Sequence, residues 1–146
     1  MTVATHGVLN RATNVPTTPD SVFQIGSITK VWTATWCCSW SPRDAWTWTT
    51  DREGPASLRL ADPEAVRTVT IRHLLTHTSG IDGDIFTDTG RGDDCLARYA
   101  DLLAEAGINH PPGATWSYCN SGYSLLGLVV EELTGGTWDQ RCGSGC

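Results

Sequence analysis

The sequence predicts an α+β chain in which helices dominate and a single strand comes first. Residues 3–10 are expected to form that strand, and a turn region rich in proline and threonine continues to Ser21. Beyond it, apolar residues recur at helical spacing in segments bounded by glycine and proline. With 146 residues, the chain is long enough for one domain with a modest core.

The first two helices are predicted near residue 27 and over residues 70–76. Phe23 to Ile25 forms a short extended lead-in to a helix that begins near Ser27. The second helix is short, and its apolar residues have helical spacing from Val69 onward. Residues 80–92, rich in Asp and Gly, are expected to form a loop.

Two more helices follow this loop. One is capped by Asp93 or Asp94 and runs to about Ala106, and the other spans about residues 121–133. A rigid Pro-Pro-Gly turn at 111–113 separates them. The residues expected to face the core are Leu96, Tyr99, Ala100 and Leu103 in the first helix, and Tyr123, Leu126, Val130 and Leu133 in the second.

A Ser-x-x-Lys motif links Ser27 to Lys30, which is the only lysine in the chain. Positions i and i+3 of a helix share one face, so the lysine amine can reach the serine hydroxyl. A serine hydroxyl is a poor nucleophile until such a neighbour activates it. By itself the motif has low specificity, because Ser27 could equally be a helix N-cap after Gly26 and Lys30 a solvated first-turn residue.

Two further stretches strengthen the catalytic interpretation. The string Tyr-x-Asn occurs at residues 118–120, just before an apolar run with helical spacing, and Leu-Leu-Thr-His-Thr-Ser-Gly occupies residues 74–80. In this order the three motifs resemble the class C β-lactamase and D,D-peptidase family of serine hydrolases, which includes related esterases and D-aminopeptidases. The resemblance covers about residues 7–35 and 58–140.

The resemblance implies a role for each motif residue. Ser27 would form an acyl-enzyme with an amide, ester or lactam carbonyl, and Lys30 would take up or relay its proton. Tyr118 would be the partner acid or base, with its phenol acidified by the lysine. Asn120 would position the substrate and the lysine. Alternatively, Tyr118 is a half-buried aromatic bonded to a backbone carbonyl, and Asn120 caps the following helix.

The resemblance also implies a partial β-lactamase/transpeptidase-like fold that lacks most of its central antiparallel sheet. The family's third motif, Lys-Thr-Gly or His-x-Gly, lies on a strand far downstream and supplies the second oxyanion donor, and no such motif follows Tyr118. Losing one oxyanion donor costs about a hundred- to a thousand-fold in rate. We therefore expect little or no hydrolase activity from this chain alone.

Residues 36–57 and 141–146 do not fit the surrounding pattern. Four of the seven tryptophans lie between residues 36 and 48, and neither helical nor strand spacing organises the first segment. In a G+C-rich gene, codons for Leu-Asp-Leu-Asp-Asp read one base out of phase give Trp-Thr-Trp-Thr-Thr, the string at 46–50. The hypothesis is that both segments are translated out of frame within a single incomplete domain, residues 1–146.

The cysteines and histidines suggest neither a disulfide framework nor a metal site. Of six cysteines, four lie in the suspect segments, which leaves Cys95 and Cys119. The i, i+4 pair His73 and His77 lacks the glutamate of a His-Glu-x-x-His motif. We predict no metal and no cofactor.

Charge and hydropathy limit the classes of partner that we expect for this chain. A net charge of −6 and a pI near 5.0 argue against nucleic acid, and no run of eighteen apolar residues could span a membrane. No signal peptide is visible, so a cytoplasmic location is the default expectation, although Met1 can be an internal methionine. The expected partner is a small molecule or peptide with a reactive carbonyl.

Three functional classes stay open. The chain is a serine hydrolase by descent, a non-catalytic module that binds penicilloyl groups or peptides in the same pocket, or the non-functional product of a damaged gene. Among substrates, the sequence does not separate a β-lactam, a D-Ala-D-Ala peptide and a simple ester.

Overall fold

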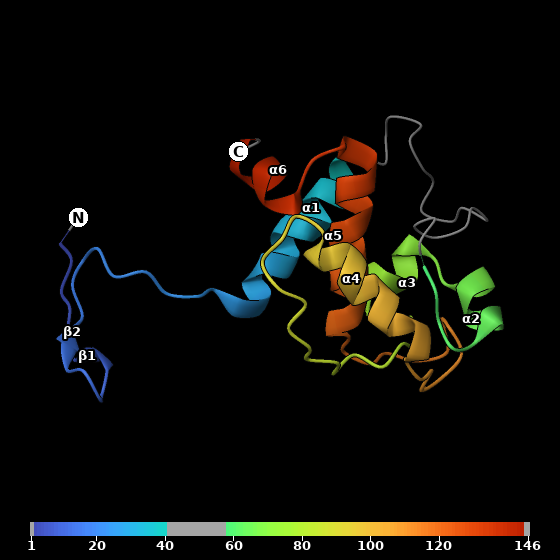
Figure 1. The fold of residues 1–146 in the computed structure, drawn as a ribbon, viewed down its shortest axis with the longest axis horizontal. Helices are drawn as coiled ribbons and strands as arrows, with labels where there is room; N and C mark the ends of the chain where they lie inside the picture. Colours follow the sequence, from blue (N-terminus) through green and yellow to red (C-terminus); the bar gives the residue numbers. More distant parts are fainter. Residues whose placement is uncertain (1, 41–57, 145–146) are drawn as a thin grey trace.

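A computed structural model describes residues 2–40 and 58–144, which form an N-terminal arm and a helical body (Figure 1). The arm carries a hairpin in which β1 (Val8–Asn10) pairs antiparallel with β2 (Val15–Pro16). Asn14 takes a positive φ of 53° in the turn, a conformation that asparagine tolerates better than most residues. This hairpin is the only sheet in the described ranges.

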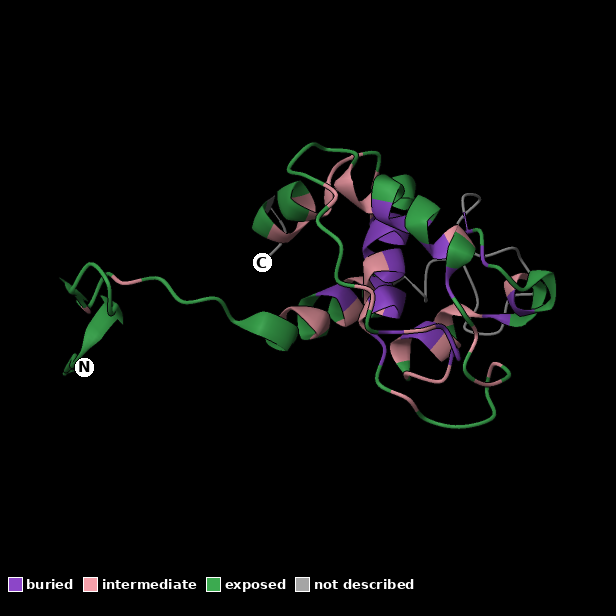
Figure 2. Cartoon of the chain, turned by 60° about the horizontal axis from the view of Figure 1, so that its bottom comes forward, coloured by how far each residue is buried: buried purple, intermediate pink, exposed green. Residues whose placement is uncertain are grey.

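The strand at the N-terminus is shorter than predicted. Residues 3–7, expected to belong to it, have no regular secondary structure. Strands need backbone partners, and the short β2 supplies partners only near Val8 and Asn10. Side chains of the arm are almost all exposed, so the hairpin packs against nothing in the helical body (Figure 2).

The helical body contains the remaining elements. A 3₁₀ turn, η1 (Gly26–Ile28), leads directly into α1 (Thr29–Trp40). The elements after residue 57 are α2 (Pro63–Thr68), α3 (Ile71–Leu75), α4 (Cys95–Leu102), the 3₁₀ turn η3 (Leu103–Glu105), α5 (Asn120–Thr134) and α6 (Trp138–Ser144).

The central helix of the body is α5, which is contacted by α1, α3, α4 and α6. Most of its residues between Ser121 and Val130 are buried, as Figure 2 shows along the middle of the body. The Cys119 sulfur accepts a hydrogen bond from the Gly122 N–H and caps its N-terminus. At its C-terminus Gly135 adopts a left-handed φ of 66°, a conformation suited to glycine.

Leucines from several elements meet around α5 and form the core. The largest fully buried side chains include Leu74 of α3, Leu103 of η3, and Leu125 and Leu126 of α5. This confirms most of the predicted apolar stripes, but Leu133 is 42% exposed.

The suspect segment 36–57 is partly helical. Residues 36–40 continue α1, Cys37 is buried, and Trp36 packs against the core. The helix therefore extends five residues into a segment whose sequence shows neither helical nor strand spacing. The rest of the segment, 41–57, lies outside the described residues, and residues 141–144 form the end of α6.

The helix predicted from residue 93 or 94 to 106 divides into α4 and η3. Asp94 precedes α4 as predicted, but its side chain makes no capping hydrogen bond. Instead its carboxylate pairs with Arg98 at 2.7 Å, one turn further along. In its described residues the chain is mostly helical with one small sheet, which confirms the predicted fold class. In the described part of the chain, none of the helices has the length and apolarity needed to cross a bilayer.

Candidate active site

Ser27 lies in the turn that begins the α1 helix. Gly26, just before it, has a positive φ of 55°, which favours glycine and redirects the chain into the helix. The Thr29 N–H donates to the carbonyls of Gly26 and Ser27, so η1 and α1 form one continuous helical segment. The Ser27 hydroxyl therefore lies near the partial positive charge of a helix N-terminus.

Lys30 connects the two ends of the site. Its Nζ atom donates hydrogen bonds to Ser27 Oγ at 3.2 Å and to Asn120 Oδ1 at 2.7 Å. The first contact follows from i, i+3 spacing on a helix, and the second joins the start of α1 to the start of α5. The lysine is therefore held in one orientation from two directions.

Tyr118 completes the cluster from the segment before α5. Its hydroxyl donates to Ser27 Oγ at 2.7 Å, and Lys30 Nζ lies 4.9 Å from the centre of its ring. The Lys30 ammonium, together with the hydrogen bond to Ser27, lowers the pKa of the phenol below its usual 10.0. Tyr118 is accordingly easier to ionise than an ordinary tyrosine.

All four residues predicted from the Ser-x-x-Lys and Tyr-x-Asn motifs meet in this cluster. The simpler interpretations are wrong in detail: Ile25, not Ser27, is the N-cap of η1, and Cys119, not Asn120, is the N-cap of α5. The Tyr118 hydroxyl bonds the Ser27 side chain rather than a backbone carbonyl. The cluster is open to solvent, because Ser27 is exposed and Tyr118 is 41% exposed.

Aromatic side chains surround Tyr118 in a way that the sequence did not reveal. The His77 ring stacks on the Tyr118 ring with centroids 4.5 Å apart, and the Tyr123 ring lies 5.1 Å from His77. Tyr123 in turn donates from its hydroxyl to the Leu75 carbonyl at 3.0 Å. No local sequence pattern indicates these contacts, because they join residues more than forty positions apart.

The two histidines that were considered as a metal-binding pair form hydrogen bonds with different parts of the chain. His73 Nδ1 accepts from the Thr70 N–H at 3.3 Å as part of a capping box, whereas His77 Nδ1 accepts from the Cys119 N–H at 3.0 Å. Within residues 2–40 and 58–144, no three potential ligands converge on a metal position.

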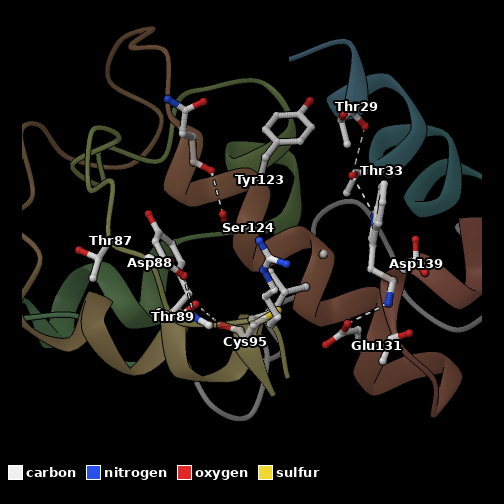
Figure 3. A pocket seen from close by; sticks show the side chains of 18 of the residues that line it. Thr29, Thr33, Thr87, Asp88, Thr89, Cys95, Tyr123, Ser124, Glu131 and Asp139 are labelled. Atoms are coloured by element: carbon white, nitrogen blue, oxygen red, sulfur yellow. Dashed lines mark hydrogen bonds between the residues drawn. The ribbon is translucent and has the colours of Figure 1, made fainter. Parts of the chain in front are cut away.

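A groove of about 1100 Å³ extends from the cluster along α5. Ser27, Lys30 and Asn120 line one end of it. Figure 3 shows Thr29 and Thr33 of α1 on one side, residues 87–89 on the other, and α5 between them. A substrate bonded through its carbonyl at Ser27 would find room for its remaining groups here.

A family model described as Beta-lactamase matches residues 2–144. Penicillin-binding protein 4 of Amycolatopsis lactamdurans is 52% identical over 136 residues, which cover 91% of this chain and 35% of that protein. This chain therefore spans about a third of the length of that relative.

Solved structures agree with the sequence match. The penicillin binding protein from Bacillus halodurans superposes with a TM-score of 0.69 at 30% identity, covering 97% of this chain and 45% of that one. D-amino acid amidase from Ochrobactrum anthropi superposes with a TM-score of 0.73 over 95% of this chain and 38% of its own, and at 22% identity it supports the fold alone. By both sequence and fold, the chain belongs to the Beta-lactamase family.

Proposed function

We propose that this chain carries the acylation site of a serine hydrolase that acts on amide, ester or lactam carbonyls. One observation carries the proposal: Ser27 Oγ is within hydrogen-bond distance of both Lys30 Nζ and Tyr118 Oη. A nucleophile, a cation and an acidified phenol in mutual contact are the groups that acyl transfer needs.

In the proposed first step, Tyr118 acts as the base. Once its phenol is ionised, the Ser27 hydroxyl turns and donates its proton to the phenolate, while Oγ attacks the carbonyl carbon. The carbonyl π electrons move to oxygen and give a tetrahedral oxyanion, next to the N-terminus of α1. The positive charge of Lys30 stabilises the phenolate before the transfer.

The tetrahedral intermediate then collapses to the acyl-enzyme. Its oxyanion reforms the carbonyl, the bond to the leaving group breaks, and Tyr118 returns its proton to the departing amine or alkoxide. Water later attacks the acyl carbon with the same proton movements in reverse order, which releases the acid and regenerates Ser27. Asn120 keeps Lys30 oriented through its Oδ1 atom.

The relatives agree with a carbonyl substrate. Two of them are named as penicillin-binding proteins, and a penicillin is a lactam. A lactam presents a carbonyl carbon to a nucleophile, so the chemistry that these names indicate is acyl transfer. The choice among β-lactam, peptide and ester remains part of the proposal.

We expect turnover by this chain to be low. Ser27 is exposed and Tyr118 is 41% exposed, so water screens the charges that would stabilise the oxyanion. Acylation is the step that the described residues support, and deacylation is expected to be slow.

The test compares acylation and turnover with p-nitrophenyl acetate and a fluorescent penicillin. We expect a slow burst of p-nitrophenolate and a covalent adduct, both abolished in Ser27→Ala and retained in Ser39→Ala, a change at an exposed serine of α1. An adduct without turnover would favour the non-catalytic penicilloyl-binding alternative. No adduct with either probe would refute the proposal.

The suspected frame change is a separate proposal, which bears on whether the natural product is a working enzyme. If the gene were read in an alternate frame, residues 36–57 and 141–146 would be replaced by a different amino-acid sequence. Sequencing the gene tests this. The expected result is a family-like amino-acid sequence in another reading frame across both segments. The absence of such a sequence would refute the frame change.

A further inference from the structure

His77 lies at an unusual place in the backbone, just after α3. Its φ of 58° is in the left-handed region, and Asn14 is the only other non-glycine residue in the described ranges with a positive φ. Histidine adopts this conformation more readily than most residues, although it is still uncommon. The turn directs the His77 carbonyl and its ring toward the segment that carries Tyr118.

That segment has no secondary structure of its own. Residues 116–119 belong to no helix or strand, so the position of Tyr118 depends on contacts from elsewhere. The Ser117 N–H donates to the His77 carbonyl at 2.8 Å, and the Cys119 N–H donates to His77 Nδ1 at 3.0 Å. His77 therefore accepts from the backbone on both sides of Tyr118.

The imidazole adds a third contact by stacking on the tyrosine itself. Its ring lies 4.5 Å from the Tyr118 ring at an interplanar angle of 27°, within the range for offset aromatic pairs. The rings of Trp116 and Tyr123 lie 6.1 Å and 5.1 Å from it. His77 thus contacts the backbone and the side chain of the segment at once.

We propose that His77 is a positioning residue for Tyr118, holding the phenol against Ser27 by two backbone hydrogen bonds and a ring stack. The inference rests on the proposed function, since it gives Tyr118 its reason to be held there. It assigns His77 no contact with substrate. Displacing a reacting group by about 1 Å can slow a reaction about a hundredfold, so such a residue matters without touching the chemistry.

The geometry also requires one protonation state of His77. Nδ1 accepts a hydrogen bond, so the ring must be neutral with its proton on Nε2. Burial, and then the positive charge of Lys30, lower the pKa of His77 and favour this neutral form. Tyr118, Tyr123 and the Trp116 ring are the other groups that face it.

Three variants of His77 separate its contributions. His77→Ala removes the ring and its acceptor. His77→Asn restores an acceptor at the position of Nδ1 and tolerates a left-handed backbone, whereas His77→Phe restores only the ring. His73→Asn is the matched control, because His73 caps α3 four residues earlier and has no hydrogen bond to the Tyr118 segment.

Two readouts apply to each variant that circular dichroism shows to be folded. The first is the pKa of Tyr118 from near-ultraviolet absorbance, taken as the difference from Tyr118→Phe in a chain with three tyrosines. The second is the rate of Ser27 acylation by p-nitrophenyl acetate.

We expect His77→Ala to raise the pKa of Tyr118 toward its ordinary value and to slow acylation about a hundredfold. His77→Asn should restore most of the lowered Tyr118 pKa and most of the acylation rate, whereas His77→Phe should restore little of either quantity. His73→Asn should change stability alone. An unchanged Tyr118 pKa in folded His77→Ala, or better rescue by phenylalanine than by asparagine, would overturn the inference. Absence of acylation in the parent chain would instead refute the proposed function, and the titration would still decide the role of His77.

Discussion

Ser27 Oγ accepts two hydrogen bonds in the structure, one from an ammonium and one from a phenol. The two donors differ in the role that we propose for them. The Lys30 ammonium is also bound to Asn120, which keeps its charge in place, whereas the Tyr118 phenol is the group whose pKa is lowered. At the scale of single residues, the site is therefore a serine poised between a fixed cation and an ionisable phenol.

Replacing Lys30 with methionine tests the role of the cation. The thioether chain has a similar length and no charge, so Tyr118 loses the largest cause of its lowered pKa. We expect the tyrosine pKa to rise toward its ordinary value and Ser27 acylation to fall about a hundred- to ten-thousand-fold, the range of general acid–base catalysis. Lys30→Arg, which retains the charge, should keep the low tyrosine pKa.

The pH dependence of acylation tests the role of the phenol. If Tyr118 must be ionised to accept the Ser27 proton, the rate rises with increasing pH through the tyrosine pKa. Because that pKa is lowered, the rise is centred below pH 10.0. The measurement is the initial rate with p-nitrophenyl acetate across pH, and Tyr118→Phe should lose this rise. A rate in Tyr118→Phe that follows the parent profile would contradict the assignment.

At the scale of elements, the site depends on how closely the loop after α3 approaches the segment before α5. The Asn120 N–H donates to the Gly83 carbonyl at 3.2 Å. A Cβ added at Gly83 would lie 2.6 Å from Cys119 Cα and 2.8 Å from the Tyr118 carbonyl oxygen. Only glycine fits this contact, because both obstacles are backbone atoms.

Gly83→Ala should therefore move Tyr118 and Asn120 away from Ser27. We expect acylation to fall about a hundredfold, the consequence of displacing a reacting group by about 1 Å. Gly107→Ala is the matched control, since a Cβ there would meet no atom within 4 Å. Stopped-flow acylation rates compare the two, and equal rates would contradict the packing argument.

Much of the element order followed from local sequence. The helix predicted over residues 121–133 spans Asn120–Thr134, because its apolar spacing and the glycine after it are local signals. The strand predicted over 3–10 was too long, since strand length depends on a partner elsewhere in the chain.

In the candidate site too, some contacts follow from local sequence and others depend on distant parts of the chain. Ser27 and Lys30 are three positions apart, so helical spacing alone predicts their contact. Contact of Tyr118 with them was implied by the family resemblance, not by spacing. The role of His77 could not be predicted, because it depends on a left-handed backbone and on contacts with residues 117 and 119, about forty positions away.

At the scale of the whole molecule, the N-terminal arm is notable for apolar side chains that the rest of the chain leaves exposed. Val22 and Phe23 are 92% and 66% exposed, and both strands of the hairpin are exposed as well (Figure 2). Exposed apolar groups and unpaired strand edges promote association between chains. The arm therefore predicts self-association of the isolated chain.

Analytical ultracentrifugation tests this expectation. We expect concentration-dependent association that Val22→Ser combined with Phe23→Ser reduces without lowering the melting temperature, because neither side chain packs in the core. Leu126→Ala is the contrasting variant: it removes a fully buried side chain and should cost about 2–5 kcal/mol of unfolding free energy. A parent chain that stays monomeric at all concentrations would contradict the expectation.

In the proposed reaction, Ser27 is the nucleophile that becomes acylated. Peptide mass spectrometry of the chain after reaction with a penicillin locates the acylated residue. We expect one added penicilloyl group, located on the peptide that contains Ser27 and absent from Lys30→Met under the same conditions. An adduct on any other residue, or one that forms equally in Ser27→Ala, would contradict it.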